Sequence, residues 1–144
     1  METEAQWIGG RTATDPKEQI DFQPLLAQGR LEQVDLDGEA EELSFINFAA
    51  ENLGDGEAIS AAIALHRGWT LAIDDGKARK VFAQFASGMQ MTTTVEVLKH
   101  WADTANMPPD VLRAALQDVE IRGPYKLKGT HPLFGWWQGA TTTP

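Results

Sequence analysis

The chain has 144 residues, of which 42% are hydrophobic and 23% charged, and its formal net charge is −9. A chain of this length and composition can bury a core and is unlike an intrinsically disordered one. The negative charge argues against a broad basic surface for nucleic acid, but an acidic site can still bind phosphate groups through a metal ion.

The sequence contains neither cysteine nor a long apolar segment. Without cysteine there is no disulfide framework and no thiolate metal site, which fits a reducing compartment. No apolar run approaches the roughly 18 residues of a membrane-spanning helix, and residues 1–10 show no signal-peptide pattern. We therefore expect a cytoplasmic protein that does not associate with membranes.

The first third of the chain gives weak signals for secondary structure. Residues 1–8 resemble a helix that has already begun and that ends at two glycines. Residues 11–21 are polar and predict an exposed loop, while 22–27 predict a short helix and 31–36 a short strand. Residues 39–53 predict a longer helix, because apolar side chains recur there at helical spacing and form one stripe that we expect to be buried: Leu43, Ile46, Ala50 and Leu53.

Residues 54–86 give the clearest pattern, a helix–strand–helix unit. Asp55 can cap a helix whose body, 58–65, is apolar except for one serine, so we expect this helix to be buried on several sides. The apolar run 69–73 is typical of a parallel strand covered on both faces. A second helix is predicted from Gly76, with one apolar face: Ala78, Val81, Phe82 and Phe85.

The second half of the chain continues the alternation. Residues 89–92 predict a strand, 95–105 a helix, and 108–119 a further helix that is opened by two prolines. Residues 123–144 predict a loop-like tail apart from 132–137. Alternating helices and short apolar strands indicate the α/β class, and we expect a three-layer α/β/α sandwich with a mostly parallel sheet.

Three carboxylates are predicted to meet at one end of this sheet. Asp74 and Asp75 directly follow the predicted strand, and Glu57 lies in the first turn of the preceding helix, which must run antiparallel to that strand. Ligands of open α/β sheets bind beyond the carboxyl ends of the strands. Three carboxylates without a cationic partner repel one another, so a divalent cation is the natural neutraliser, and oxygen ligands alone favour Mg²⁺ or Mn²⁺. Such an ion can activate water for phosphodiester hydrolysis.

The same carboxylates have a structural interpretation, and spacing alone favours it. A carboxylate in the first turn of a helix, such as Glu57, is stabilised by the helix dipole. Asp75 can cap the helix that begins at Gly76. Both interpretations therefore remain open at the level of the sequence.

The motifs of this segment resemble those of PIN-like nuclease domains. Residues 54–58 read GDGEA, 61–65 read AAIAL and 71–79 read LAIDDGKAR, which is similar to small bacterial members of that family. The resemblance covers about residues 20–138. It implies one PIN-like domain over 1–144, with a poorly defined start up to residue 20 and a C-terminal extension from residue 123. It also implies a Mg²⁺- or Mn²⁺-dependent ribonuclease, many of which are the toxins of toxin–antitoxin pairs.

Carried over residue by residue, the resemblance implies a set of metal ligands. The acid of the GEA motif corresponds to Glu57, and the acid after the family's fourth strand corresponds to Asp75 or its neighbour Asp74. Another acid of the family lies on an early helix, to which the fragment around Glu4 is similar. These four residues are the metal-site candidates, and the first three are the catalytic candidates.

Four further residues are candidates for binding the RNA substrate. The threonine that follows the last strand of the family corresponds to Thr94 or Thr93. Lys77 and Arg79 follow the acidic pair and could meet a phosphate backbone beside the metal. The competing interpretation of these two cations is a solvated helix face.

The sequence departs from the family at its start. The family opens with a strand that ends in an aspartate, a principal metal ligand, and nothing before Met1 supplies them. We therefore expect a PIN-like domain without its N-terminal strand, with exposed sheet edges that invite pairing with another chain and with doubtful activity. The alternative function is a non-catalytic remnant that acts by homo-oligomerisation or by binding an antitoxin-like protein. A third interpretation is an acidic binding module without a metal.

Overall fold

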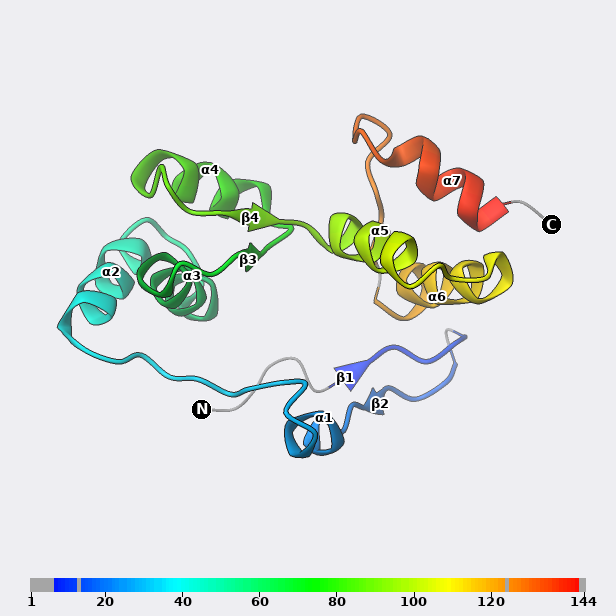
Figure 1. The fold of residues 1–144 in the computed structure, drawn as a ribbon, viewed down its shortest axis with the longest axis horizontal. Helices are drawn as coiled ribbons and strands as arrows, with labels where there is room; N and C mark the ends of the chain where they lie inside the picture. The colour runs from blue at the N-terminus through cyan, green and yellow to red at the C-terminus, as the bar shows by residue number, and fades with distance from the viewer. Residues whose placement is uncertain (1–6, 13, 124, 143–144) are drawn as a thin grey trace. The chain divides into compact units, whose positions relative to one another are not determined.

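The computed structural model describes residues 7–12, 14–123 and 125–142, which form a mixed α/β structure dominated by helices (Figure 1). The chain divides into two compact units. The middle unit is Gln33–Val97, and the terminal unit combines Met1–Glu32 with Leu98–Pro144. Within the described ranges, no helix has the length and apolar character needed to cross a membrane.

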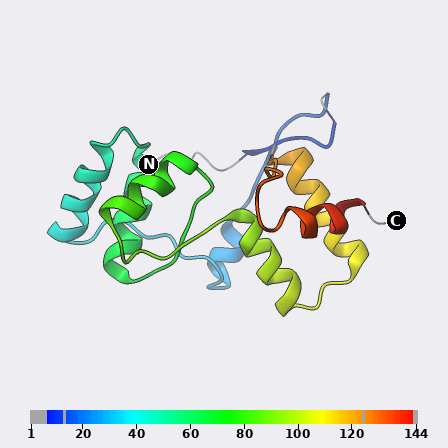
Figure 2. The same cartoon turned by 90° about the horizontal axis from the view of Figure 1, so that it is seen from above.

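The middle unit contains one small parallel sheet. Its elements, in chain order, are helix α2 (Glu39–Ala49), helix α3 (Asp55–Arg67), strand β3 (Leu71–Ala72), helix α4 (Gly76–Phe85) and strand β4 (Met91–Thr92). The two strands pair in parallel, with Leu71 opposite Met91 and Ala72 opposite Thr92. Figure 2 shows the same elements, coloured cyan to green, from above. The strands predicted at 69–73 and 89–92 are therefore confirmed, in shorter form.

The core of the middle unit is built around alanines on α3. Phe82 of α4 is fully buried and meets Phe48 of α2 edge to face, with ring centroids 5.1 Å apart. Small side chains on α3 let the neighbouring helices approach closely. The buried helix body predicted at 58–65 is confirmed for most of its length. Five of its residues are buried: Ala58, Ala61, Ala62, Ile63 and Ala64.

Helix α2 buries a different face from the one that its apolar spacing predicts. Leu53 is the only residue of the predicted stripe that is buried. The buried side chains of α2 are instead Glu41 and Phe48. The aromatic ring of Phe48 removes a large apolar area from water, and an ion pair holds Glu41 on the same side. The rest of the predicted stripe is exposed: Leu43, Ile46 and Ala50.

The ends of α3 differ in one respect from expectation. Gly54, not Asp55, occupies the capping position, and Asp55 lies in the first turn. At the other end, Gly68 closes the helix in the left-handed conformation, with φ of 66°. A residue without Cβ adopts this conformation at little cost, so the chain can leave α3 abruptly and enter β3.

The terminal unit is mainly helical. Its elements are strands β1 (Trp7–Ile8) and β2 (Glu18–Gln19), helix α1 (Gln23–Ala27), most of helix α5 (Thr94–Thr104), helix α6 (Pro109–Arg122) and helix α7 (Phe134–Thr142). The two strands pair antiparallel. Leu116 of α6 and Trp137 of α7 are buried, and the Trp137 indole N–H donates to the Glu120 carboxylate at 2.5 Å.

Predictions for residues 7–8, for 31–36 and for the C-terminal tail are wrong in detail. Trp7–Ile8 belongs to a strand, not to a helix, because its backbone pairs with Glu18–Gln19; residues 1–6 lie outside the described ranges. Residues 31–36 are irregular and not a strand, since no neighbouring strand pairs with them among the described residues. The tail is not loop-like throughout, because α7 continues to Thr142 and buries Trp137. The short helix predicted at 22–27 is confirmed as α1.

Candidate functional site

The carboxyl ends of β3 and β4 bring Asp74 and Thr94 into contact. Asp74 lies two residues beyond β3, and Thr94 begins α5 directly after β4. The Thr94 backbone N–H donates to Oδ1 of Asp74 at 3.0 Å, and the Thr94 hydroxyl donates to Oδ2. Because the strands are parallel, residues that follow them emerge at the same edge of the sheet. Two candidates taken from the sequence, 20 positions apart, are thus direct neighbours.

Arg79 ties the same two strand ends together. Its Nη1 donates to the carbonyl oxygen of Ile73 at 3.2 Å and to that of Thr92 at 3.3 Å. One guanidinium nitrogen therefore bridges the two backbone segments that lead from β3 to Asp74 and from β4 to Thr94. The structure places Arg79, a candidate for binding substrate, against the backbone that carries the candidate site.

Thr93 and Glu96 form a reciprocal cap at the start of α5. The Thr93 backbone N–H and hydroxyl donate to Oε2 of Glu96 at 2.8 and 2.9 Å, and the Glu96 backbone N–H donates back to the Thr93 hydroxyl at 3.4 Å. The Thr92 hydroxyl also donates to Glu96. The pattern Thr-x-x-Glu at residues 93–96 is the signal by which the sequence alone could have predicted this cap.

The environment of Glu96 favours its charged form. Partial burial acts to raise the pKa of this carboxyl, but the hydrogen bonds from Thr93 and Thr92 and the positive charge of Arg79 together lower the pKa below its usual value. Glu96 is therefore an additional carboxylate beside the strand ends. It fixes the turn that presents Thr94 to Asp74.

Glu57 and Asp75 both act as helix caps. Oε2 of Glu57 accepts from the Gly54 backbone N–H at 3.2 Å, and Oδ1 of Asp75 accepts from the Ala78 backbone N–H at 2.8 Å. Each cap uses one carboxylate oxygen, and the second oxygen accepts no hydrogen bond within the described chain. The structural role is thus present at both residues, and one oxygen of each is left for another ligand.

The remaining candidates are placed as follows. Lys77 donates from Nζ to the carbonyl oxygen of Asn52 at 2.6 Å, so it binds the chain just after α2. Asn52 has a positive φ of 57°, and the lysine contact stabilises this tight turn. Glu4 lies outside the described residues.

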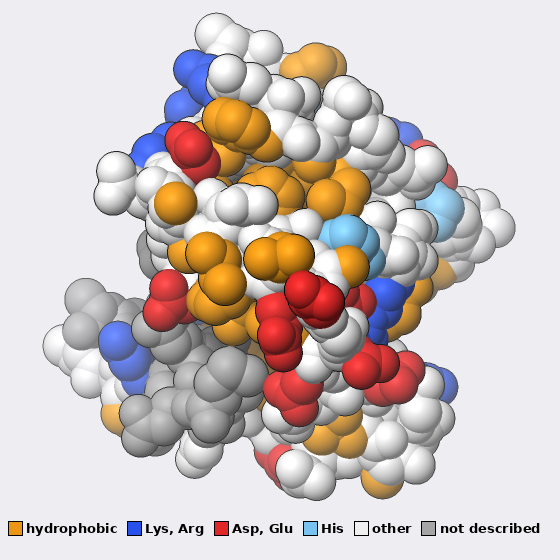
Figure 3. Space-filling model, turned by 90° about the vertical axis from the view of Figure 1, so that its left-hand side faces the viewer, with side chains coloured by type: hydrophobic (Ala, Val, Ile, Leu, Met, Phe, Trp, Pro, Cys, Tyr) orange, Lys and Arg blue, Asp and Glu red, His pale blue; other side chains and the backbone are white. Residues whose placement is uncertain are grey.

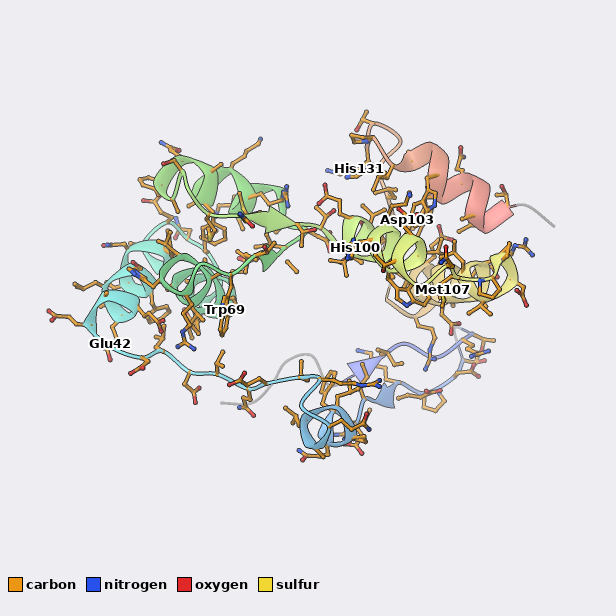
Figure 4. The ribbon with its side chains drawn as sticks, in the orientation of Figure 1. Glu42, Trp69, His100, Asp103, Met107 and His131 are labelled. Carbon is orange, nitrogen blue, oxygen red and sulfur yellow. The ribbon has the colours of Figure 1, made fainter. Side chains whose placement is uncertain are left out.

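The donor chemistry of the strand ends fits a hard cation, but the arrangement is not a complete site. Carboxylate and hydroxyl oxygens are suitable ligands for Mg²⁺ or Mn²⁺. Among residues 7–12, 14–123 and 125–142, however, no three acidic or histidine side chains come together to hold a metal ion. The labelled His100 and Asp103 come from α5 and His131 from the segment before α7 (Figure 4). The His131 ring accepts the Leu133 backbone N–H at 3.1 Å.

A second electrostatic cluster holds α2 against α3. Nε and Nη2 of Arg67 donate to the two oxygens of Glu41 at 2.8 and 2.9 Å, and Nη2 also donates to the Asp35 carbonyl. The hydrogen bonds from Arg67 and from the Asp37 backbone N–H lower the pKa of Glu41 to about 2. The guanidinium also lies over the ring of Trp69, which Figure 4 labels, at 5.3 Å from the ring centroid. These residues are satisfied within the fold, so we assign them a structural role.

Comparisons with known proteins return no match: none among protein-family models, curated proteins or solved structures.

Proposed function

We propose that the chain is a PIN-like domain, with the three-layer α/β/α architecture of that family, and acts in the cytoplasm as a Mg²⁺- or Mn²⁺-dependent ribonuclease. Its proposed substrate is single-stranded RNA, and its proposed biological setting is that of a toxin held in check by an antitoxin-like protein.

The observation that carries this proposal is the contact between Asp74 and Thr94. The resemblance makes Asp74 a candidate metal ligand and Thr94 a candidate for binding substrate, although they are 20 positions apart in the chain. They meet beyond the carboxyl ends of adjacent parallel strands, which is where ligands of open α/β sheets bind. Asp75 and Glu57 cap the helices at whose starts they lie, whereas Asp74 accepts from the first backbone N–H of α5, a helix that begins 20 positions further along the chain. This contact caps α5 and at the same time holds the Asp74 carboxylate at the edge of the sheet where a ligand would bind.

In this proposal the residues have distinct roles. Glu57, Asp74 and Asp75 are the proposed ligands of the cation, with Glu4 as a further one, and the first three carboxylates would have to come closer together than they are in this structure to hold it. The cation would supply charge stabilisation and an activated water. Thr94 orients the Asp74 carboxylate by donating to both of its oxygens, and Thr93 sets the start of α5. Lys77 and Arg79 lie on the adjoining helix and would favour an approaching phosphate backbone.

An alternative proposal is a non-catalytic PIN-like protein that acts through contacts with other chains, including homo-oligomerisation. The observation that favours it is the small sheet: β3 pairs only with β4 among the described residues, which leaves strand edges available for pairing. The lack of a group of three metal ligands in the same part of the chain also favours it.

Cleavage of a single-stranded RNA oligonucleotide separates the two proposals. The ribonuclease proposal predicts cleavage that requires Mn²⁺ or Mg²⁺. The cleavage rate should fall by about a hundredfold in Asp74→Asn and Glu57→Gln, because each variant replaces a charged carboxylate ligand of the cation by a neutral amide. Glu32→Gln, an exposed residue of the terminal unit, serves as the matched control and should leave the rate unchanged.

Three outcomes contradict the ribonuclease proposal: no cation-dependent cleavage by the full chain, cleavage that survives Asp74→Asn, or equal losses in the control. Circular dichroism of each variant distinguishes a lost ligand from a lost fold. The alternative predicts an oligomer by light scattering, and a well-folded monomer would contradict its homo-oligomeric form.

A further inference from the structure

One face of the middle unit exposes large apolar side chains in an ordered arrangement. Leu43 and Ile46 lie on the outer face of α2 at helical spacing, and Phe85 stands at the end of α4; all three are more than half exposed. We call the surface made by Leu43, Ile46, Ala50 and Phe85 the α2 face. Isolated exposed apolar residues are normal, but an apolar stripe at helical spacing is the pattern by which a helix packs against a partner.

A groove of about 340 Å³ runs beside this stripe. It lies between the three helices of the middle unit, with Phe48, Leu65 and Phe85 as its apolar lining. Residues of α2 and of the segment that follows it complete the lining: Ser44, Asn47, Ala50 and Glu51. The α2 face therefore combines projecting apolar side chains with a concave site beside them, a surface suited to a helix that lays its own apolar face into a groove.

The charged residues of α2 and of the segment that follows it, up to residue 53, are all acidic. Residues 39–53 contain four glutamates and no lysine or arginine. Glu41 is paired with Arg67, whereas the other three are exposed and form no ion pair within the described chain: Glu39, Glu42 and Glu51. Figure 3 views the middle unit from the side of α2 and α4 and shows hydrophobic side chains gathered there, with acidic and basic ones beside them.

This charge pattern selects the occupant. In an isologous dimer the same patch meets itself, so three unpaired glutamates on one copy would face the same glutamates on the other. The net charge of −9 adds to this repulsion. A partner with an apolar stripe flanked by lysine or arginine instead satisfies both the groove and the carboxylates.

We propose that the α2 face is a docking surface for a basic amphipathic helix of another protein. Leu43, Ile46 and Phe85 are its apolar contacts, and Glu39, Glu42 and Glu51 are the charges that select a cationic partner. The inference stands independently of the ribonuclease proposal, because these residues are distinct from those at the strand ends and binding can be measured without any cleavage.

Fluorescence anisotropy of a labelled peptide tests the proposal with the full chain. The probe is a helical peptide of about 18 residues with leucines on one face and lysines flanking them, a length that can form a helix on binding. A second peptide keeps the leucines and replaces every lysine by glutamate. The basic peptide should bind, its affinity should fall as salt is raised, and the acidic peptide should not bind.

Two sets of variants locate the binding surface. Ile46→Gln and Phe85→Ser should each weaken binding roughly tenfold, as expected for a contact residue near the centre of an interface. Ile121→Gln is the matched control, since Ile121 lies in the terminal unit at 57% exposure against 58% for Ile46. The triple reversal of Glu39, Glu42 and Glu51 to lysine should abolish binding of the basic peptide, while Glu32→Lys should not.

Each other outcome overturns the proposal. Equal binding of both peptides would mean apolar adhesion without charge selection. Equal weakening by Ile121→Gln or Glu32→Lys would mean diffuse attraction to an acidic protein. A dimer by light scattering that Ile46→Gln converts into a monomer would assign the α2 face to a second copy of the chain. Absence of any binding by the folded chain would remove the docking surface altogether.

Discussion

Thr94 donates two hydrogen bonds to the carboxylate of Asp74, one from its backbone N–H and one from its hydroxyl. The contact joins the residue beyond one parallel strand to the first residue of the helix after the other. It thereby fixes both the distance between the strand ends and the direction in which the Asp74 carboxylate points. Any function of this edge of the sheet depends on that orientation.

Replacing Thr94 by valine should destabilise the middle unit by about 1 kcal/mol, because the hydroxyl donor is lost while the backbone N–H remains. The small magnitude reflects the solvent exposure of Asp74. Urea unfolding measures the change, and Thr94→Ser, which keeps the hydroxyl, is the control. Equal stability of the valine and serine variants would show that the hydroxyl bond contributes nothing.

Arg79→Met should loosen the strand ends, because the carbonyl oxygen of Ile73 loses its guanidinium donor and that of Thr92 keeps only the Ile73 backbone N–H. The expected cost is about 1–2 kcal/mol for a partly buried, charge-assisted pair of bonds. Hydrogen exchange should accelerate at the Thr94 amide more than at amides within α3. Lys80→Met, an exposed cation one position away on the same helix, is the control. Uniform acceleration in both variants would contradict a local role for Arg79.

Stability should depend on pH through Glu41. Its pKa is about 2 in the folded protein and 4.5 for the free side chain. As the pH falls, the unfolded state takes up a proton first, so the stabilisation from the Arg67 pair is complete above pH 4.5 and is lost progressively toward pH 2. The difference in unfolding free energy between wild type and Glu41→Gln should shrink over this interval.

The matched substitution for this pH test is Glu42→Gln, at an exposed glutamate without an ion pair in the described chain. Its stability difference from wild type should stay nearly constant across the same range of pH. A flat profile for Glu41→Gln as well would show that the ion pair does not contribute to folding.

Phe82→Ala should destabilise the protein by about 3–5 kcal/mol, because it removes a fully buried ring that packs edge to face against Phe48. Phe85→Ala, on the same helix but 56% exposed, should cost well under half of this. Urea or thermal unfolding of the two variants provides the comparison. Similar losses at both positions would contradict the assignment of Phe82 to the core and Phe85 to the surface.

Local patterns in the sequence were sufficient to predict several elements. The apolar body at 58–65, the helix from Gly76 and the short runs before Asp74 and Thr93 all correspond to observed elements. In each case the signal is carried by neighbouring residues: helical periodicity, or a short apolar run that a parallel strand requires. The candidate Asp74 followed from its place at the end of one of those runs and from the family resemblance, whereas Thr94 followed from the resemblance alone.

Tertiary packing decided what periodicity leaves open. Spacing showed that α2 has an apolar stripe, but the stripe is exposed, because Phe48 and the Glu41–Arg67 pair turn the opposite side of the helix inward. The strand at Trp7–Ile8 likewise depends on a partner segment at Glu18–Gln19 that local pattern does not identify. The sequence by itself determined where the helices and strands form from residue 39 to residue 92, since these depend on residues a few positions apart. Which face of α2 is buried and which residue the Asp74 carboxylate contacts were decided only by the tertiary structure, because those contacts join residues 20 or more positions apart.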